Sequence, residues 1–238
     1  MTTVIDLIKA YISPDSVWRW ILSGFYHFPI RFVFALVSSV ICTKKLSGNY
    51  WPIRVRVAGG QKFRLYCSPF QKVQLQGILR VNQWIGSDSP SSLTLGAGSS
   101  FVLLGDFEVG PGVHIYVSPG AELKIAGRLN SSGSGITCNT RIMVEKLVEI
   151  GTDCIIAWDV CISDSDLHDI KGARRTAPVF IGNHVWIAHG SSIMKGAIIP
   201  SGCIVAAKSL VRSAIDSERA LVAGAPAVVK RTGVEWSR

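Results

Sequence analysis

The chain has 238 residues, of which 48% are hydrophobic and 17% are charged, and this composition excludes a disordered protein. Its 23 glycines follow no G-X-Y period, which excludes collagen. The length allows one domain with a core plus an appendage. The six cysteines form no C-x-x-C pair, so we expect reduced thiols in a cytoplasmic protein.

The net charge of +9 is concentrated near the N-terminus, where residues 1–66 carry nine Lys or Arg against two acidic residues, Asp6 and Asp15. An anionic membrane surface, an acidic glycan or ordinary solubility would each account for this excess. Nucleic acid is not an expected partner, because the sequence contains no known binding module and apolar runs interrupt the basic residues.

The first 50 residues are apolar but do not resemble a membrane-spanning helix. The apolar run Phe25–Cys42 is interrupted by His27, Pro29 and Arg31, which leaves too few uninterrupted residues to cross a bilayer. We expect residues 1–50 to form a helical segment. It either caps the main domain or makes peripheral membrane contact beside a basic patch, and the two roles are compatible.

A six-residue repeat organises the rest of the chain. Neither an α-helix nor an isolated strand has a period of six, whereas a sustained hexapeptide period is typical of a parallel β-helix. Apolar residues keep this period in two registers. The repeated positions are Ile181, Ile187, Ile193, Ile199, Val205 and Val211, preceded by Cys138, Val144, Ile150, Ile156 and Ile162.

We expect these residues to stack inside the coil, with three hexads forming each turn. Small or β-branched residues follow four positions later and are expected at the corners. A looser period over 93–130 predicts that the coil begins earlier, with a register change at 131–135, and residues 51–80 are expected to lead into it. The predicted fold class is all-β: a parallel β-helix over 51–212, a helical segment over 1–50 and a C-terminal tail over 213–238.

Three stretches within the repeat carry a family resemblance. They are IGNHVWIAHG at 181–190, VAAKSLV at 205–211 and AGAPAVVKR at 223–231. With the hexads, they resemble the hexapeptide-repeat O-acetyltransferases, which include the maltose and galactoside acetyltransferases and enzymes that modify capsule and lipopolysaccharide. The resemblance covers roughly residues 136–231. It implies a left-handed coil, a homotrimer with active sites between subunits, acetyl-CoA as co-substrate and no metal. It also implies that the C-terminal tail over 213–238 completes the site for acetyl-CoA.

The repeat breaks at Asp164 and resumes only at Val179, which predicts a loop on a rigid scaffold, a common place for function. Acetyl transfer to a hydroxyl needs a base to remove the proton, and histidine is suited to this near neutral pH. The family's catalytic histidine falls in this loop, so the resemblance assigns the role to His168. Asp166 or Asp164 would orient the histidine or bind sugar hydroxyls. Asp166 has the stronger claim because it occupies a corner position.

The resemblance also implies residues that bind the substrates. Trp186 is expected to line the groove for the thioester arm of acetyl-CoA. The other expected cofactor contacts are Gly190, Ala206, Ala207, Lys208, Arg212, Pro226, Lys230 and Arg231, of which the basic ones would meet phosphates. Asn139, eleven residues before Ile150, matches the spacing of an acceptor-contacting asparagine, and Arg174 and Arg175 in the loop would contact either substrate.

The expected function is acetyl-CoA-dependent O-acetylation of a bacterial surface polysaccharide or its lipid-linked precursor, at the inner face of the cytoplasmic membrane. An N-acetyltransferase for a nucleotide-linked amino sugar and a non-catalytic scaffold are the alternatives. A zinc site of the γ-class carbonic anhydrase kind is not expected, because His189 aligns with one ligand but Met194 replaces the next. A covalent mechanism would use Cys161, although the resemblance implies direct transfer.

Overall fold

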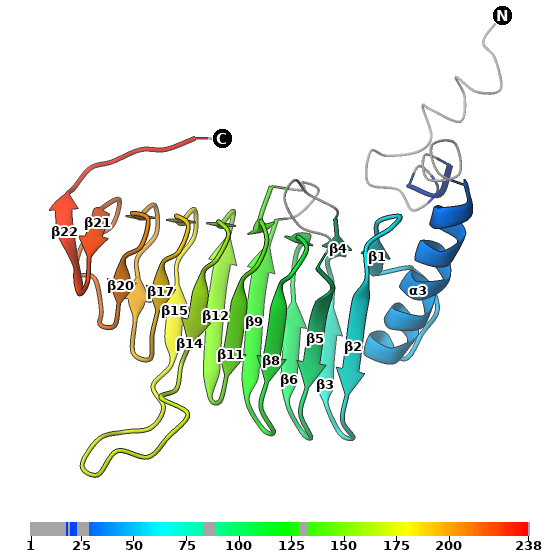
Figure 1. Ribbon diagram of the computed structural model, residues 1–238, viewed down its shortest axis with the longest axis horizontal. Helices are drawn as coiled ribbons and strands as arrows, with labels where there is room; N and C mark the ends of the chain where they lie inside the picture. The colour runs from blue at the N-terminus through cyan, green and yellow to red at the C-terminus, as the bar shows by residue number, and fades with distance from the viewer. Residues whose placement is uncertain (1–17, 19, 23–28, 83–88, 129–132, 238) are drawn as a thin grey trace, which may run out of the picture.

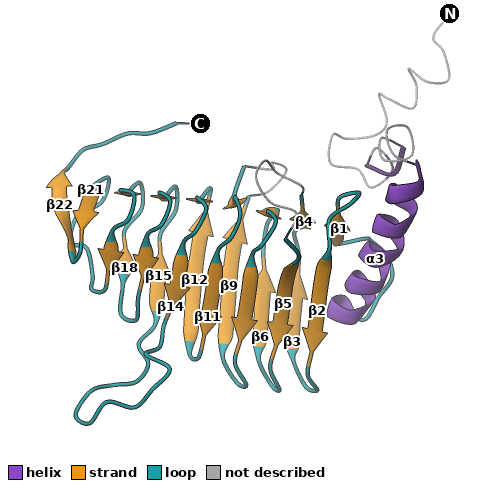
Figure 2. Ribbon diagram, in the orientation of Figure 1, coloured by secondary structure: helices purple, strands orange, loops and turns teal. Residues whose placement is uncertain are grey.

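The computed structural model describes residue 18, residues 20–22 and the ranges 29–82, 89–128 and 133–237. Its strands stack into a three-sided coil in which nearly every strand pairs in parallel with a strand of the next turn (Figure 1, Figure 2). The predicted parallel β-helix is therefore confirmed. Most of residues 1–28 and part of the predicted register change at 131–135 lie outside the described residues.

Three sheets form the sides of the coil, and we name them A, B and C. Sheet A contains β1 (Val55–Val57), β4 (Leu79–Val81), β7 (Phe107–Val109), β10 (Gly135–Ile136), β13 (Ile155–Ile156), β16 (Trp186–Ile187), β19 (Ile204–Val205), β21 (Leu221–Gly224) and β22 (Ala227–Arg231). Sheet B contains β2 (Phe63–Cys67), β5 (Ser91–Leu95), β8 (His114–Val117), β11 (Arg141–Val144), β14 (Cys161–Ser163), β17 (Ser192–Ile193) and β20 (Leu210–Val211). Sheet C contains β3 (Lys72–Leu75), β6 (Ser100–Leu103), β9 (Glu122–Gly127), β12 (Leu147–Thr152), β15 (Val179–Ile181) and β18 (Ile198–Ile199).

The repeated aliphatic residues fill the interior, as the sequence predicts. Ile156, Ile187 and Val205 are direct neighbours in sheet A, and all three are fully buried. Each side chain packs on its equivalent in the next turn, so the interior is a continuous apolar stack.

Residues 51–80 differ from the expectation that they only lead into the coil. They supply β1 to β3, which form the first turn, and most of β4, which begins the second; these four strands pair in parallel with β4 to β7. The six-residue period is weak here because the segments between strands differ in length, with five residues between β1 and β2 but three between β3 and β4. Strand pairing therefore persists where the sequence period does not.

A helix, α3 (Pro29–Ser47), covers the open N-terminal end of the coil (Figure 1). The hydroxyls of Ser39 and Thr43 accept hydrogen bonds from the backbone N–H groups of Val57 and Val55, at 2.9 and 3.0 Å. These donors belong to the outermost strand of sheet A, where unpaired amides would otherwise remain. In the described part of the N-terminal segment, α3 therefore caps this end of the coil. Within that part, no helix is both long enough and apolar enough to cross a membrane.

Ile198 and Ile199 are consecutive residues of β18 that face opposite sides of the sheet, with 43% and 1% of their surfaces exposed. We expect Ile199→Ala to lower the free energy of unfolding by about 2–5 kcal/mol, because it leaves a cavity between turns. Ile198→Ala removes the same atoms from the outer face and should cost less than about 1 kcal/mol. Urea denaturation monitored by circular dichroism measures both. Equal losses would contradict the stacking account.

Candidate active site

A loop of residues 164–178 leaves the coil between β14 and β15, at the corner between sheets B and C (Figure 1). This loop is where the sequence predicts an interruption of the repeat. Backbone hydrogen bonds close its base: Asp166 donates to the carbonyl of Arg175, and Ala177 donates to that of Asp164, at 3.0 and 2.9 Å. The loop therefore has a fixed base and an exposed tip, on which His168 lies.

Glu145, in the turn between β11 and β12, holds the loop to the coil. Its carboxylate accepts hydrogen bonds from Arg175 Nε and Nη2 at 2.9 and 2.8 Å, and from Ser165 Oγ at 2.6 Å. The hydrogen bonds from Arg175, and then from Ser165, lower the pKa of Glu145 below its ordinary value. The carboxylate therefore keeps its charge, and the bidentate contact persists, well below neutral pH.

The two candidate orienting carboxylates already have partners. Asp164 is fully buried and accepts three backbone N–H groups, from Glu145, Lys146 and Leu147, at 2.6–2.7 Å. Asp166 forms an ion pair with Lys195. Among the described residues, His168 makes no hydrogen bond, so this single chain does not join it to either aspartate. Asp164 instead fixes the turn that carries Glu145.

The predicted acceptor residues fall into two places. Arg174 lies in the loop and offers its carbonyl to Lys195 at 2.6 Å, while Arg175 is held by Glu145. Asn139 lies at the corner between sheets A and B. There it lines a polar cavity of about 370 Å³ together with His114, Arg141 and Asp159. The cavity and the loop are at opposite ends of the strands of sheet B.

The predicted cofactor residues gather on sheet A and at its corner with sheet B. Trp186 and Ala206 point outward from sheet A. Gly190 and Lys208 occupy successive turns of the corner, where the Lys208 backbone N–H donates to the His189 carbonyl at 2.9 Å. Ala207 lies beside Lys208, and Pro226, Lys230 and Arg231 belong to the β21–β22 hairpin at the end of the sheet. Arg212 is separate, at the end of β20 in sheet B.

Two residues of this region carry no signal in the sequence. Glu145 and Lys195 lie about 20–30 positions from the loop residues that they contact, and nothing in the hexapeptide pattern connects them. Only the stacking of adjacent turns brings them to the base of the loop.

The protein is thus a hexapeptide-repeat coil with one long inserted loop in its described part after β11. That loop, residues 164–178, carries the exposed His168. No family model matches the chain. Named acetyltransferases do match it, which confirms the resemblance seen in the motifs.

The chain is 34% identical over 121 residues to the polysialic acid O-acetyltransferase of Escherichia coli O1:K1 / APEC, a match that covers 48% of this chain and 38% of that protein. It is 31% identical over 96 residues to WbbJ of Escherichia coli K12, named for lipopolysaccharide biosynthesis O-acetyl transfer, covering 34% of this chain and 48% of that one. The chain thus spans less than half the length of these relatives.

Among solved structures, the polysialic acid O-acetyltransferase OatWY superposes with a TM-score of 0.53 at 21% identity, covering 74% of this chain and 88% of that one. This likeness concerns the fold, which is the left-handed parallel β-helix that the family resemblance implies.

Removing the Glu145 carboxylate should loosen the loop. We expect Glu145→Ala to increase the rate of tryptic cleavage at Lys171 and Arg174 about tenfold, because bidentate charge-assisted hydrogen bonds are lost and local opening becomes easier. Glu149→Ala is the matched control, since Glu149 pairs with Lys124 at 2.9 Å on the outer face of sheet C. Mass spectrometry of timed digests locates the cuts. Equal cleavage in the two variants would refute the clamp.

Proposed function

We propose that this protein transfers the acetyl group of acetyl-CoA to a hydroxyl of a bacterial surface glycan, with His168 as the general base. The observation that carries the proposal is the clamped loop, which holds an exposed histidine away from an otherwise regular coil. The named acetyltransferase relatives support the same reaction class.

In the proposed reaction, the imidazole of His168 accepts the proton of the sugar hydroxyl while the oxygen attacks the thioester carbonyl carbon. An ester bond forms, the carbon–sulfur bond breaks, and the CoA sulfur leaves with its electron pair. The imidazolium then returns the proton to that sulfur, so the histidine is regenerated. Such proton transfer contributes about 10²–10⁴-fold to a rate.

Asp166 is the better candidate to orient His168, because its carboxylate is partly exposed and paired with Lys195, whereas Asp164 is fully buried and accepts three backbone N–H groups. A nucleophilic cysteine is disfavoured by the environment of Cys161. Burial raises the pKa of its thiol above the ordinary value, so the reactive thiolate is scarce at neutral pH. Direct transfer is therefore the simpler mechanism.

A homotrimer with sites between subunits is part of the proposal. In one chain, the His168 loop projects from the corner between sheets B and C, whereas the expected acetyl-CoA residues other than Arg212 line sheet A and its corner with sheet B. Sheet B separates the two groups. They would form one site where the loop of one chain faces sheet A of a neighbour.

The acceptor that we favour is a hydroxyl of a polymeric or lipid-linked glycan. Two of the relatives are named for polysialic acid and for lipopolysaccharide biosynthesis. The cavity with Asn139 and Arg141 offers amide, guanidinium and carboxylate groups that suit sugar hydroxyls and acidic substituents. Acetylation of an amino sugar is the competing reaction.

Replacing the base should abolish most of the activity. We expect His168→Ala to reduce kcat/KM for acetyl transfer by about 100-fold or more, and Cys161→Ala to retain wild-type activity. The assay incubates acetyl-CoA with candidate surface glycans and follows the acetyl mass increment by mass spectrometry.

Two outcomes would overturn the assignment. Loss of activity in Cys161→Ala with retention in His168→Ala would indicate a covalent cysteine mechanism. A product that keeps its acetyl group in mild base would be an amide, because an ester is cleaved there, and would indicate the competing N-acetyltransferase.

The N-terminal cap suits peripheral contact with a membrane, which we propose as its second role. Large apolar side chains of α3 recur every three or four positions on the face turned away from the coil. They are Ile30, Val33, Phe34, Val37 and Ile41, and Ile30 and Phe34 are 75% and 74% exposed. An apolar stripe of this kind can enter the interface of a bilayer.

The charges around this stripe have a single sign. Residues 29–66 contain no Asp or Glu, and Arg31, Lys62 and Arg64 line a groove of about 460 Å³ beside Phe34. Lys44 and Lys45 follow at the C-terminal end of the helix, next to the exposed aromatics Tyr50 and Trp51. Each basic residue near an anionic surface contributes about 1 kcal/mol to binding.

Vesicle binding tests this role with a matched pair of variants. Val37 of α3 and Val228 of β22 are 52% and 50% exposed, and these two elements lie at opposite ends of the coil (Figure 1). We expect Val37→Glu to weaken co-sedimentation with phosphatidylglycerol-containing vesicles at least about fivefold, and Val228→Glu to leave it unchanged. Phosphatidylcholine vesicles should bind poorly. The membrane role would be refuted if the wild-type protein did not co-sediment with anionic vesicles. It would also be refuted if Val37→Glu changed self-association but not vesicle binding.

A further inference from the structure

Sheet B differs from the other two sheets in its charge. Across the strands that the structure describes, it is the one sheet with no Asp or Glu, although its strands carry Arg64, His114 and Arg141. Acidic residues do occur on the strands of sheets A and C, such as Glu108 of β7 and Glu149 of β12. The outer face of sheet B therefore carries basic groups that its own strands do not neutralise.

The basic side chains of sheet B stand in one row that crosses the turns of the coil. Strand pairing aligns the residues of this row in the order Arg64, Ser92, His114 and Arg141. Adjacent strands are about 4.8 Å apart, so the two arginines are separated by about 14 Å along the coil. At its far end, the row enters the polar cavity that His114 and Arg141 line together with Asn139.

The two arginines of this row are available to a ligand. Within the described ranges, neither Arg64 nor Arg141 forms an ion pair, and both are exposed. Sheet C shows the opposite arrangement, because Lys124 on its outer face lies 2.9 and 3.5 Å from carboxylate oxygens of Glu149 and Glu122. An exposed guanidinium without an internal partner can bind a carboxylate through two parallel hydrogen bonds.

A second row, beside the first, is aromatic. Tyr66 and Tyr116 are 55% and 46% exposed, and Thr94 lies between them in the strand register. They point to the same side of the sheet as Arg64 and His114, two positions further along each strand. An exposed tyrosine offers an apolar ring face and a hydroxyl, which suits a sugar ring with its apolar face and polar edge.

Phe70 extends the aromatic row to the corner between sheets B and C. It is 88% exposed and has a φ of 65°. The equivalent positions in the next two turns are Gly98 and Gly120, with φ values of 66° and 71°. The corner thus requires a left-handed backbone, in which a bulky side chain is strained. Because Phe70 also adds nothing to the core, its place here points to binding.

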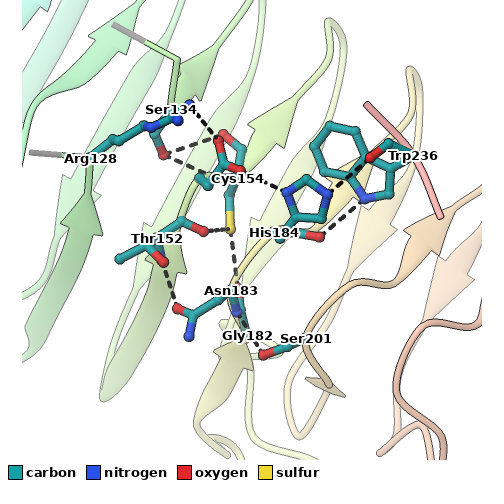
Figure 3. A network of polar contacts seen from close by, with 10 residues as sticks. Arg128, Ser134, Thr152, Cys154, Gly182, Asn183, His184, Ser201 and Trp236 are labelled. Atoms are coloured by element: carbon teal, nitrogen blue, oxygen red, sulfur yellow. Dashed lines mark hydrogen bonds and ion pairs between the residues drawn. The ribbon is translucent and has the colours of Figure 1, made fainter. Parts of the chain in front are cut away.

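A second polar cluster without an assigned role, at the corner between sheets C and A, pairs its groups internally (Figure 3). The ring of His184 stacks on that of Trp236, with centroids 4.0 Å apart, and Trp236 Nε1–H donates to the His184 carbonyl at 3.1 Å. His184 Nδ1 lies 2.7 Å from Asp153, which also pairs with Arg128 at 3.3 Å. This cluster anchors the C-terminal segment, whereas the cations of sheet B have no such internal partners.

We propose that the outer face of sheet B binds an extended polysaccharide that carries carboxylates, and that this polymer is the acceptor. We call this surface the sheet B face. It consists of Arg64, His114, Arg141, Tyr66, Tyr116 and Phe70. The arginines bind carboxylates of separate sugar units, and the aromatic side chains pack on sugar rings between them. The inference rests on the proposed function for its reaction, whereas binding to the face is measurable without acetyl-CoA.

Polymer binding tests the sheet B face with a matched control. We expect Arg64→Ala and Tyr66→Ala each to weaken the binding of end-labelled polygalacturonate about tenfold, because each removes one contact of an extended ligand. Fluorescence anisotropy in the absence of acetyl-CoA measures the affinity. Lys72→Ala, which removes an exposed cation from β3 in sheet C, should change it less than about twofold. The galacturonate monosaccharide cannot reach both arginines and should bind at least about 100-fold more weakly than the polymer.

Phe70→Gly separates binding from folding. Glycine adopts the left-handed conformation without strain, so we expect this variant to keep or raise the Tm. Its affinity for polygalacturonate should nevertheless fall about fivefold, because an aromatic contact is lost. Differential scanning fluorimetry and the same anisotropy assay measure the two effects. A lower Tm with unchanged polymer binding would contradict the assignment of Phe70 to the sheet B face.

Three results would overturn the inference. The first is an equal loss of affinity in Lys72→Ala and Arg64→Ala. The second is binding of polyglutamate that is as tight as that of polygalacturonate and insensitive to Tyr66→Ala, which would indicate attraction of charge alone. The third is a change in the molecular mass of Arg64→Ala, measured by light scattering, with polymer binding unchanged. That result would identify the face as a subunit contact.

The wild-type protein separates this inference from the proposed function. If it binds neither polygalacturonate nor hyaluronan but acetylates a neutral glycan, the inference is overturned and the proposed function stands. If polymer binding depends on Arg64 and Tyr66 but no acetyl group is transferred from acetyl-CoA, the proposed function is overturned and the binding surface stands.

Discussion

Each turn of this protein buries its inward side chains only against the turns above and below it, and the rest of the structure follows from that dependence. A stack of this kind has two unfinished ends. At the first end, α3 covers the interior, and Ser39 and Thr43 accept the free amides of β1. At the other end, β22 pairs antiparallel with β21 and so reverses the chain, which then returns along the corner to Trp236. Both ends are completed by segments that belong to no repeat.

The same dependence explains where the chemistry can lie. The buried side chains lie on the strands, so residues inserted at a corner do not disturb the core packing. The loop of residues 164–178 interrupts no strand pairing, because β14 and β15 on either side of it still pair with β17 and β18. An insertion alone would be too mobile to position a base. Here the base of the loop is anchored. Arg175 makes a bidentate contact with Glu145, and the buried Asp164 accepts backbone N–H groups from the turn that carries Glu145. The residues that anchor the loop are therefore distinct from His168, the proposed base.

The sequence predicts the parts of this structure that repeat, and misses those that depend on neighbouring turns. Ile187 and Val205 are recognisable because every turn imposes the same inward position. Val55 and Leu79 stack in the same way, yet the segments inserted between the early strands conceal their period. Glu145, Lys195 and Trp236 meet their partners across about 20–50 residues, and no local propensity encodes such contacts. By its position in the sequence, Asp164 is a candidate to orient His168. In the folded chain its carboxylate accepts hydrogen bonds from three backbone N–H groups.

The two proposed surfaces also constrain the acceptor. α3 covers one end of the coil, while the His168 loop follows β14, four strand steps along sheet B from β2. Adjacent strands are about 4.8 Å apart, so the loop stands about 20 Å further along the coil than the first turn. If α3 rests on the bilayer, a sugar attached directly to a lipid headgroup would lie beside the first turns, short of the base. A hydroxyl several sugar units away would reach it. The distance between cap and loop therefore favours an extended glycan over a lipid-linked monosaccharide.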